Sequence, residues 1–224
     1  MEEVNVVMWI DVCGCLPLTV LIICSVCRMV RREHVPVIYY TNVLIANLIP
    51  LSMQIILVAK LDYNKNSIIY PSIFFCGAMA SLYFKMCIAL ERYFLLAYPL
   101  LDCIRQTQGS VLVCVLVWVL CVVSVPLAIV LQDSSRLVIY ALLPAPLFIS
   151  CLAGTLKTLP AATSVPREEK QRVVGTLVLL LLNYFVMILP IIICKMLYCS
   201  YFYIAFIFFL LSPFVDLILF FFHV

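Results

Sequence analysis

Charged residues are scarce in this sequence, and their scarcity excludes a soluble fold. Asp, Glu, Lys and Arg make up 11% of the 224 residues, whereas 67% are hydrophobic and the mean hydropathy is +1.22. Soluble domains are about 25% charged and about 45–50% apolar. No polar stretch is long enough to form a soluble domain. The composition therefore predicts an integral membrane protein, with the lipid bilayer as its first partner.

Histidine is nearly absent, which argues against metal chemistry and catalysis. The two histidines, His34 and His223, have no His or Cys cluster around them, and no cysteine pair has zinc-ligand spacing beside a histidine. The twelve cysteines lie mostly inside apolar runs, where free Cys behaves as a small buried hydrophobe. We therefore expect no metal site, no cofactor and no enzymatic activity. The net charge of +3 comes from short loops and forms no patch for nucleic acid.

Long apolar runs separated by short polar breaks fill the chain. A bilayer core about 30 Å thick needs roughly 20 apolar residues per helix, and the runs are too long for the roughly ten-residue strands of a membrane barrel. We predict an all-α bundle of seven transmembrane helices, a single domain over residues 1–224, with no cleaved signal peptide. The predicted spans are 5–28, 37–60, 68–97, 109–131, 137–159, 171–197 and 200–222. Dividing 171–222 rests on length alone, since one helix of that size is too long to span once.

Lysine and arginine are unevenly divided between the two sets of loops. With the N-terminus outside, the outer side holds Lys60, Lys65, Arg136 and Lys195. The inner side then holds Arg28, Arg31, Arg32, Arg92, Arg105, Lys157, Arg167, Lys170 and Arg172. Cytoplasmic loops carry an excess of Lys and Arg. The sequence therefore predicts a multi-pass plasma-membrane protein with an outer N-terminus and a cytoplasmic C-terminus.

Charges at the end of the third predicted span need an explanation. Glu91, Arg92 and Tyr93 follow a long apolar run. An Arg at the membrane edge can extend its charge to the headgroups, and the adjacent Glu lowers its cost, so a structural role is open. Lys85 lies about two turns deeper on the same face. A Lys at that depth is costly unless it is paired, and it is by default a functional hypothesis.

These features resemble the rhodopsin-like (class A) G-protein-coupled receptors. The stretch "LERYFLLAYPL" is similar to the end of the family's third helix and its second inner loop. Ser81 and Trp118 stand at the positions of the third-helix serine and the fourth-helix tryptophan. Other matched landmarks are Thr19, Asn47, Pro144, Pro190 and "DLILF", residues 216–220. The sequence is nearest the branch that contains purinergic-like, lipid and proton-sensing receptors.

The resemblance implies a signalling mechanism. In the resting state Arg92 pairs with Glu91. An agonist then moves the sixth helix outward about Pro190, and Arg92 is freed to meet the α-subunit tail of a heterotrimeric G protein. The residues that the resemblance assigns to this activation switch are Glu91, Arg92, Tyr93, Pro190, Asp216 and Phe220.

The resemblance also implies a polar core. Its members are Thr19, Asn47, Ser81 and Asp216, and we place Lys85, a charge that the family does not carry, among them. The family normally holds a sodium ion there between acidic groups, but Asn47 is an amide. We expect the Lys85 ammonium to take the cation's place beside Asp216. The alternative is that Lys85 extends to the membrane surface or faces a water-filled gap.

The ligand is only coarsely defined. Phe74 occupies the position where amine receptors carry Asp, which argues against a biogenic amine. Arg136 and Lys195 at the mouth suggest an anionic extracellular ligand, such as a small molecule or a lipid, although interfacial anchoring explains them equally well. The predicted ligand-binding residues are Gln54, Phe74, Phe75, Arg136, Tyr140 and Lys195.

Several positions depart from the family. Ser67 replaces the disulfide cysteine of the third helix, and the loop "LQDSSR" has no Cys to pair with it. Ile188 replaces the sixth-helix tryptophan, and Leu152 and Phe220 replace two tyrosines. Two alternatives to a signalling receptor therefore stay open. One is a receptor-like seven-helix protein that acts by pairing with other membrane proteins, and the other is a small transporter that uses buried charges as relays.

The loop charges make the predicted topology testable. Epitope tags at the two ends should be separated by the membrane, so that antibody on intact cells detects the N-terminal tag alone. Permeabilised cells, in which both tags are accessible, provide the control. Detection of the C-terminal tag on intact cells would contradict the orientation.

Overall fold

The described part of the chain is helical throughout. The computed structural model describes residues 36–58, 68–97, 107–131, 134–160, 166–196 and 215–216, together with single positions between 6 and 21. No strand occurs in these ranges. The helices are α2 (Pro36–Val58), α3 (Ile69–Ala97), α4 (Thr107–Val130), α5 (Ser134–Leu142), α6 (Pro144–Thr158) and α7 (Arg167–Met196).

Five predicted spans correspond to these helices. The spans 37–60, 68–97, 109–131 and 171–197 match α2, α3, α4 and α7, and the span 137–159 covers α5 and α6 together. The predicted spans 5–28 and 200–222 lie outside the described residues except for scattered positions, and those positions are helical. The helical class is thus confirmed, while seven helices and the orientation of the termini stay predictions.

Helix starts follow local sequence rules. Pro36 stands in the first turn of α2, where the missing N–H has no intrahelical partner to lose, and Pro144 begins α6. Glu168 and Glu169 lie in the first turn of α7, where negative charge is favourable beside the exposed N–H groups. The same residues keep the α7 start exposed, beyond the apolar part of that helix.

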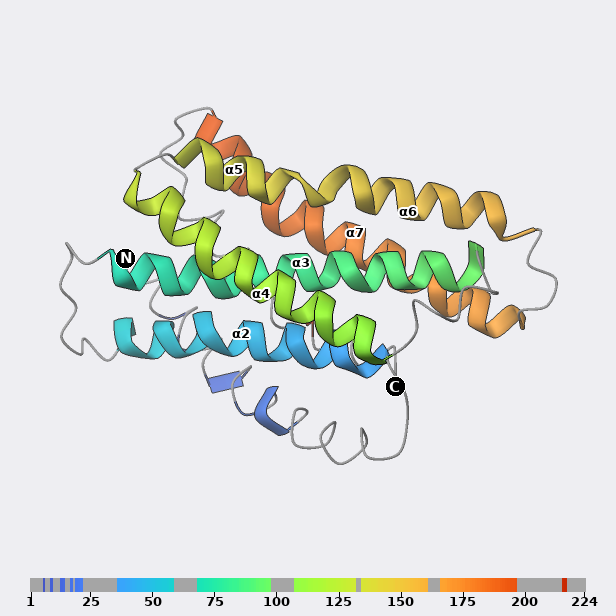
Figure 1. The fold of residues 1–224 in the computed structure, drawn as a ribbon, viewed down its shortest axis with the longest axis horizontal. Helices are drawn as coiled ribbons and strands as arrows, with labels where there is room; N and C mark the ends of the chain where they lie inside the picture. The colour runs from blue at the N-terminus through green and yellow to red at the C-terminus, as the bar shows by residue number, and fades with distance from the viewer. Residues whose placement is uncertain are drawn as a thin grey trace.

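Helix α3 is the centre of the bundle. It contacts each of the other described helices, and α4 crosses in front of α3 and α2 in Figure 1. Its buried residues occur from Ser72 to Leu96, so most of its length is enclosed. Polar groups on the buried face of α3 are therefore removed from both water and lipid.

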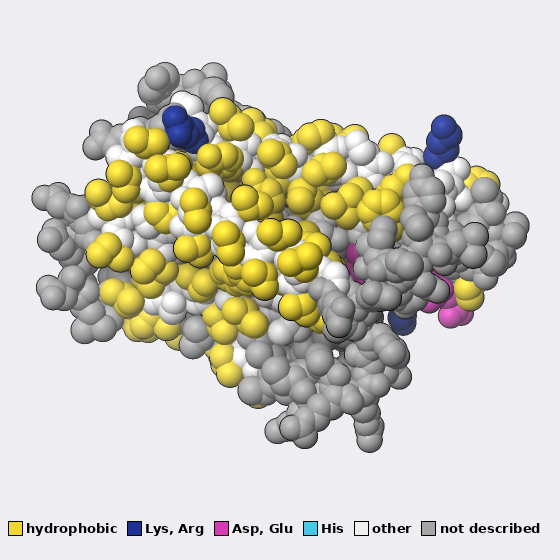
Figure 2. Space-filling view, viewed as in Figure 1, with side chains coloured by type: hydrophobic (Ala, Val, Ile, Leu, Met, Phe, Trp, Pro, Cys, Tyr) yellow, Lys and Arg dark blue, Asp and Glu magenta, His cyan; other side chains and the backbone are white. Residues whose placement is uncertain are grey.

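The outer surface of α4 is apolar. Cys114, Val117, Cys121 and Val125 form a buried stripe at helical spacing, while many Val and Leu side chains on the rest of the helix are exposed. Figure 2 shows hydrophobic side chains covering the face formed by α4, α5 and α6. Large contiguous apolar surfaces of this kind are rare on soluble monomers. This surface is suited to lipid.

Three stretches among the described residues are long and apolar enough to cross a membrane. They are Ile69–Ala97, Gly109–Val130 and Ser135–Thr158. The third of these includes the junction between α5 and α6, so the two helices together make one span. These stretches and the apolar surface are the features of a helical membrane protein.

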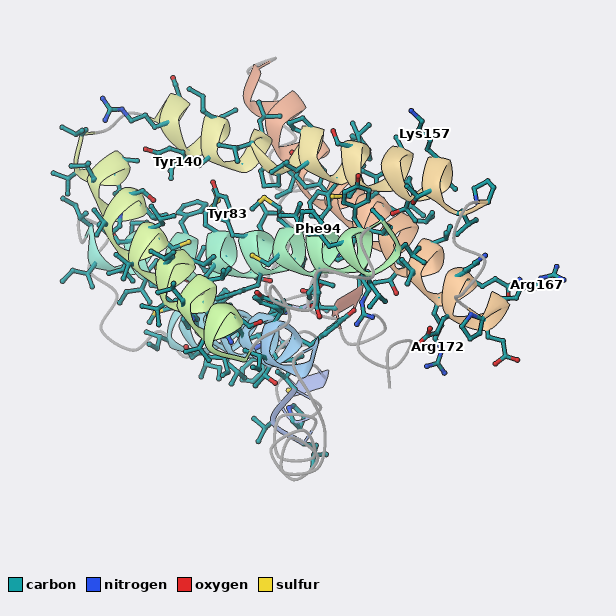
Figure 3. All side chains as sticks on the ribbon, turned by 45° about the vertical axis from the view of Figure 1, so that its right-hand side comes forward. Tyr83, Phe94, Tyr140, Lys157, Arg167 and Arg172 are labelled. Carbon is teal, nitrogen blue, oxygen red and sulfur yellow. The ribbon has the colours of Figure 1, made fainter. Side chains whose placement is uncertain are left out.

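The α5–α6 junction marks a break within a single span. Pro144 has no N–H to donate to the Tyr140 carbonyl four residues earlier. The Tyr83 hydroxyl of α3 donates to that carbonyl instead, at 3.1 Å, and Figure 3 shows Tyr83 pointing from α3 toward the helix that carries Tyr140. The Tyr184 hydroxyl of α7 donates to the neighbouring Ala141 carbonyl at 2.9 Å. Two neighbouring helices therefore supply hydrogen bonds at the break.

Helices α2 and α3 approach closely at Gly77. An added Cβ at Gly77 would lie 2.8 Å from Pro50 Cδ and from Ile49 Cβ, and 2.9 Å from the Ala46 carbonyl oxygen. Pro50 lies inside α2 and cannot donate to that carbonyl. Only glycine fits this contact without a shift of backbone. By contrast, an added Cβ at Gly175 on α7 would meet no atom within 4 Å.

We predict that Gly77→Ala lowers the free energy of unfolding by about 1–3 kcal/mol, the usual range for overpacking a close contact. Gly175→Ala is the matched control. It should be neutral or stabilising by up to about 1 kcal/mol, because Ala is the better helix former and nothing obstructs it. Thermal unfolding in detergent measures both variants. Equal stability of the two variants would show that α2 and α3 are farther apart at Gly77.

Candidate functional site

A buried ion pair lies inside the bundle. Lys85 Nζ of α3 is 2.7 Å from Asp216 Oδ1, and the two side chains are 9% and 0% exposed. The pairing predicted from the sequence is thus confirmed, and the alternative in which Lys85 extends to the membrane surface is wrong. Two opposite charges at this distance reduce the cost that each would meet alone in an apolar interior.

Two amides complete the surroundings of the carboxylate. Asn47 Nδ2 of α2 donates to Asp216 Oδ2 at 2.7 Å, and Asn183 Nδ2 of α7 donates to Asp216 Oδ1 at 2.9 Å. We call Lys85, Asp216, Asn47 and Asn183 the polar cluster. An ammonium and two amide N–H groups match a carboxylate, which only accepts hydrogen bonds. A single side chain thereby joins α2, α3 and α7.

Asn183 was missed in the sequence analysis. It lies within the apolar run "LLLLNYF", and it is 4% exposed. A lone amide in such a run is a usable signal, because an amide without a partner is costly in an apolar interior. The signal does not name the partner, since that depends on how α7 is rotated against its neighbours.

The other two predicted members of the polar core are buried. Ser81 is 3% exposed and lies one turn before Lys85 on the same face of α3. Thr19 is 1% exposed. Among the described residues, neither the Ser81 hydroxyl nor the Thr19 hydroxyl has a hydrogen-bond partner. The structure therefore joins Asn47, Lys85 and Asp216 by direct contacts, and it places Ser81 beside them.

The C-terminal end of α3 lies against two helices. Glu91, Arg92 and Tyr93 are half-buried there. The Tyr93 ring lies over Gly154 of α6, where an added Cβ would come within 2.5 Å of a ring carbon. On the other side, Tyr40 of α2 is close enough for Arg92 and Glu91 to act electrostatically on its hydroxyl. The expected pairing of Glu91 with Arg92 stays a prediction.

Trp118 fixes α4 against α2 and α3. Its indole Nε1 donates to Asn42 Oδ1 at 3.0 Å, and its ring packs against Phe84 with a centroid distance of 5.7 Å. Asn42 Nδ2 also donates to the Ile38 carbonyl at 2.9 Å and contacts Cys114 Sγ at 3.4 Å. Asn42 was not singled out from the sequence, although its polar side chain stands in an apolar helix.

The predicted ligand-binding residues are only partly described. Phe74 is 5% exposed and stacks on Tyr70, while the ring of Phe75 meets Phe74 edge-on. Arg136 is exposed on α5, and Tyr140 is half-buried. Gln54, Pro190 and Lys195 lie on α2 and α7, but their side chains are outside the described part of the chain, and Phe220 lies wholly outside it. The ligand role of Gln54, Phe74, Phe75, Arg136, Tyr140 and Lys195 stays a prediction, and so does the switch role of Pro190 and Phe220.

Comparison with known proteins adds no family assignment. No protein-family model and no curated protein matches the chain. Within the described ranges, no three His, Cys, Asp or Glu side chains are grouped so that they could hold a metal ion. The site is therefore characterised by its own contacts.

We predict that Lys85→Met lowers the free energy of unfolding by about 3–5 kcal/mol, because Asp216 would keep a buried charge without its partner. Asp216→Asn should be destabilising for the same reason. The double variant should recover much of the loss, since no buried charge remains. Thermal melts of the four proteins in detergent give the coupling energy. Strictly additive effects would mean that the two charges do not interact.

Sodium should leave the melting temperature of the wild-type protein unchanged, because the Lys85 ammonium already balances the carboxylate. The measurement compares sodium chloride with choline chloride at equal ionic strength. A melting temperature that rises with sodium alone would show that a cation competes for Asp216.

Proposed function

We propose that the chain is a seven-helix receptor of the plasma membrane that passes an extracellular signal to a heterotrimeric G protein. The observation that supports this proposal best is the contact between Asn47 and Asp216. The resemblance assigns both residues to one polar core, and their side chains are 2.7 Å apart although they are 169 positions apart in the chain. Lys85, predicted to stand in the same core, contacts the same carboxylate.

The inner end of α3 is a suitable surface for the G protein. Arg92 is half-buried beside Tyr40 of α2, and the adjacent Tyr93 packs on α6, so a partner that enters at this end of α3 can reach it. Figure 3 shows Lys157, Arg167 and Arg172 projecting outward from α6 and α7. Positive charge on this side speeds encounter with an acidic partner. The proposed division of labour is that Arg92 makes the switching contact and the outer cations guide association.

The polar cluster opposes the movement that the proposal requires. Helix α7 is the sixth predicted span, and it carries both Asn183 and Tyr184. Asn183 donates to Asp216, and Tyr184 donates to the Ala141 carbonyl. If α7 moves outward, these two hydrogen bonds break unless Asp216 and Ala141 move together with α7. These bonds favour the resting arrangement. An agonist must therefore supply differential binding energy to shift the population.

The ligand class is proposed on charge alone. Arg136 is exposed on α5, four residues before Tyr140, so the two side chains share one face of the helix. An anionic small molecule or lipid headgroup suits this cation. The backbone carbonyl of Tyr140 also accepts a hydrogen bond from the Tyr83 hydroxyl. This hydrogen bond therefore connects a ligand bound at α5 to Tyr83 of α3, which lies two residues before Lys85.

Nucleotide exchange in membranes tests the proposal. Membranes that contain the chain and a heterotrimeric G protein should exchange nucleotide faster than membranes with the G protein alone. Arg92→Ala should return the rate to the background, whereas Lys157→Ala, which removes one of the three exposed cations that guide association, should lower the rate only in part. Asn183→Leu should raise the basal rate, because one restraint on α7 is removed.

Surface-expressed protein that gives no exchange in the wild type or in Asn183→Leu would contradict the receptor proposal. That result would favour the receptor-like protein that acts by pairing with other membrane proteins. Exchange that is unaffected by Arg92→Ala would contradict the role of Arg92 alone.

A further inference from the structure

Two buried polar atoms lie beside the ion pair without hydrogen-bond partners among the described residues. They are the Ser81 hydroxyl oxygen and the Asn183 amide oxygen, Oδ1. Ser81 is 3% exposed and Asn183 is 4% exposed, so neither atom reaches bulk solvent or the membrane surface. A buried polar atom without a partner loses the free energy of the hydrogen bond that water would give it. Two such atoms at one place need a common explanation.

The two atoms belong to one small region. Asn183 Nδ2 and Lys85 Nζ contact the same oxygen of Asp216, at 2.9 and 2.7 Å, so the Asn183 amide is a neighbour of the ammonium. Ser81 is one turn before Lys85 on α3, and helical side chains lean toward the N-terminal turn. The Lys85 side chain therefore extends along the face that Ser81 occupies. The Asn183 amide and the Ser81 hydroxyl are thus both expected beside the Lys85 side chain.

The chemistry of that space selects its occupant. An apolar group would leave both oxygens unpaired. A metal cation would add an uncompensated charge, because Lys85 and Asp216 already neutralise each other in an apolar interior. A water molecule can donate to Asn183 Oδ1, exchange a hydrogen bond with Ser81 Oγ and accept from an ammonium N–H. Buried waters typically make about three such bonds.

We propose that a structural water molecule is bound between Ser81, Asn183 and Lys85, on the side of the ion pair away from Asn47. This water-binding site does not depend on the receptor proposal. It makes Ser81 a positioning residue for the ion pair, although the Ser81 hydroxyl makes no hydrogen bond to either charge among the described residues. It also gives the Lys85 ammonium a neutral partner in addition to Asp216, which stabilises a charge in a low-dielectric interior.

Removal of the Ser81 hydroxyl should change the melting temperature in opposite directions, depending on whether a water molecule is bound at the site. If water is bound, Ser81→Ala deletes one of its partners, and the melting temperature should fall by about 2–4 °C, the shift expected for one lost hydrogen bond in a chain of this size. If no water is bound, Ser81→Ala removes a buried hydroxyl that has no hydrogen-bond partner, and the melting temperature should stay unchanged or rise. The second result would overturn the proposal.

Thr155 on α6 provides the matched control. It is 0% exposed, and its hydroxyl likewise has no partner within the described ranges, but α6 contributes no residue to the polar cluster. Thr155→Val keeps the shape of the side chain and should not lower the melting temperature. An equal fall in both variants would assign the effect to packing and overturn the proposal.

A direct test is a structure of the full chain at a resolution that shows ordered water, determined once in sodium chloride and once in choline chloride. A density peak is expected in both salts, at hydrogen-bond distance from Ser81 Oγ and Asn183 Oδ1. It should be lost or displaced in Ser81→Ala. No peak, a direct bond between Ser81 and Asn183, or a peak that appears only with sodium would each overturn the proposal.

Discussion

A charge buried among apolar helices persists only with a partner, and Lys85 and Asp216 are partners in this bundle. The consequence reaches beyond the two residues. The Asp216 carboxylate contacts donor groups from three helices, so α2, α3 and α7 must each place a donor side chain at the same depth in the bundle. A rotation of any one helix by one residue would remove its donor from the carboxylate. The polar cluster thus specifies a register that apolar packing alone leaves loose.

The close contact at Gly77 supports that register. An added Cβ at Gly77 would meet the Ala46 carbonyl oxygen, and Asn47 is the next residue of α2. Ser81 follows Gly77 by one turn, and Lys85 follows Ser81 by another. The smallest side chain on α3 therefore lets α2 come close at the level where Asn47 must reach Asp216. The hydrogen bonds at the α5–α6 break come from residues next to the polar cluster. Tyr83 lies two residues before Lys85, and Tyr184 directly follows Asn183.

The features predicted correctly from the sequence are those that the cost of transfer into lipid dictates. Spans matching α2, α3, α4 and α7 were recognised because the apolar runs have the length that a bilayer requires. The Lys85–Asp216 pair was predicted because each charge alone is costly. The break at Pro144 was not predicted, since an apolar run that continues through a proline gives no sign of whether the helix ends or bends. Asn183 and the contact at Gly77 were missed because both depend on which faces of two helices meet, which composition along one helix does not specify.

Charge exchange tests the role of the ion pair most directly. In the variant Lys85→Asp/Asp216→Lys the pair is reversed, and the amides of Asn47 and Asn183 can turn to present their oxygens to the new ammonium. Each single reversal places two like charges together in the apolar interior and should abolish folding. We expect the exchanged variant to recover folded protein, measured as the monodisperse fraction in detergent, well above either single reversal. Recovery no better than that of the single reversals would contradict the claim that this ion pair sets the register of the helices.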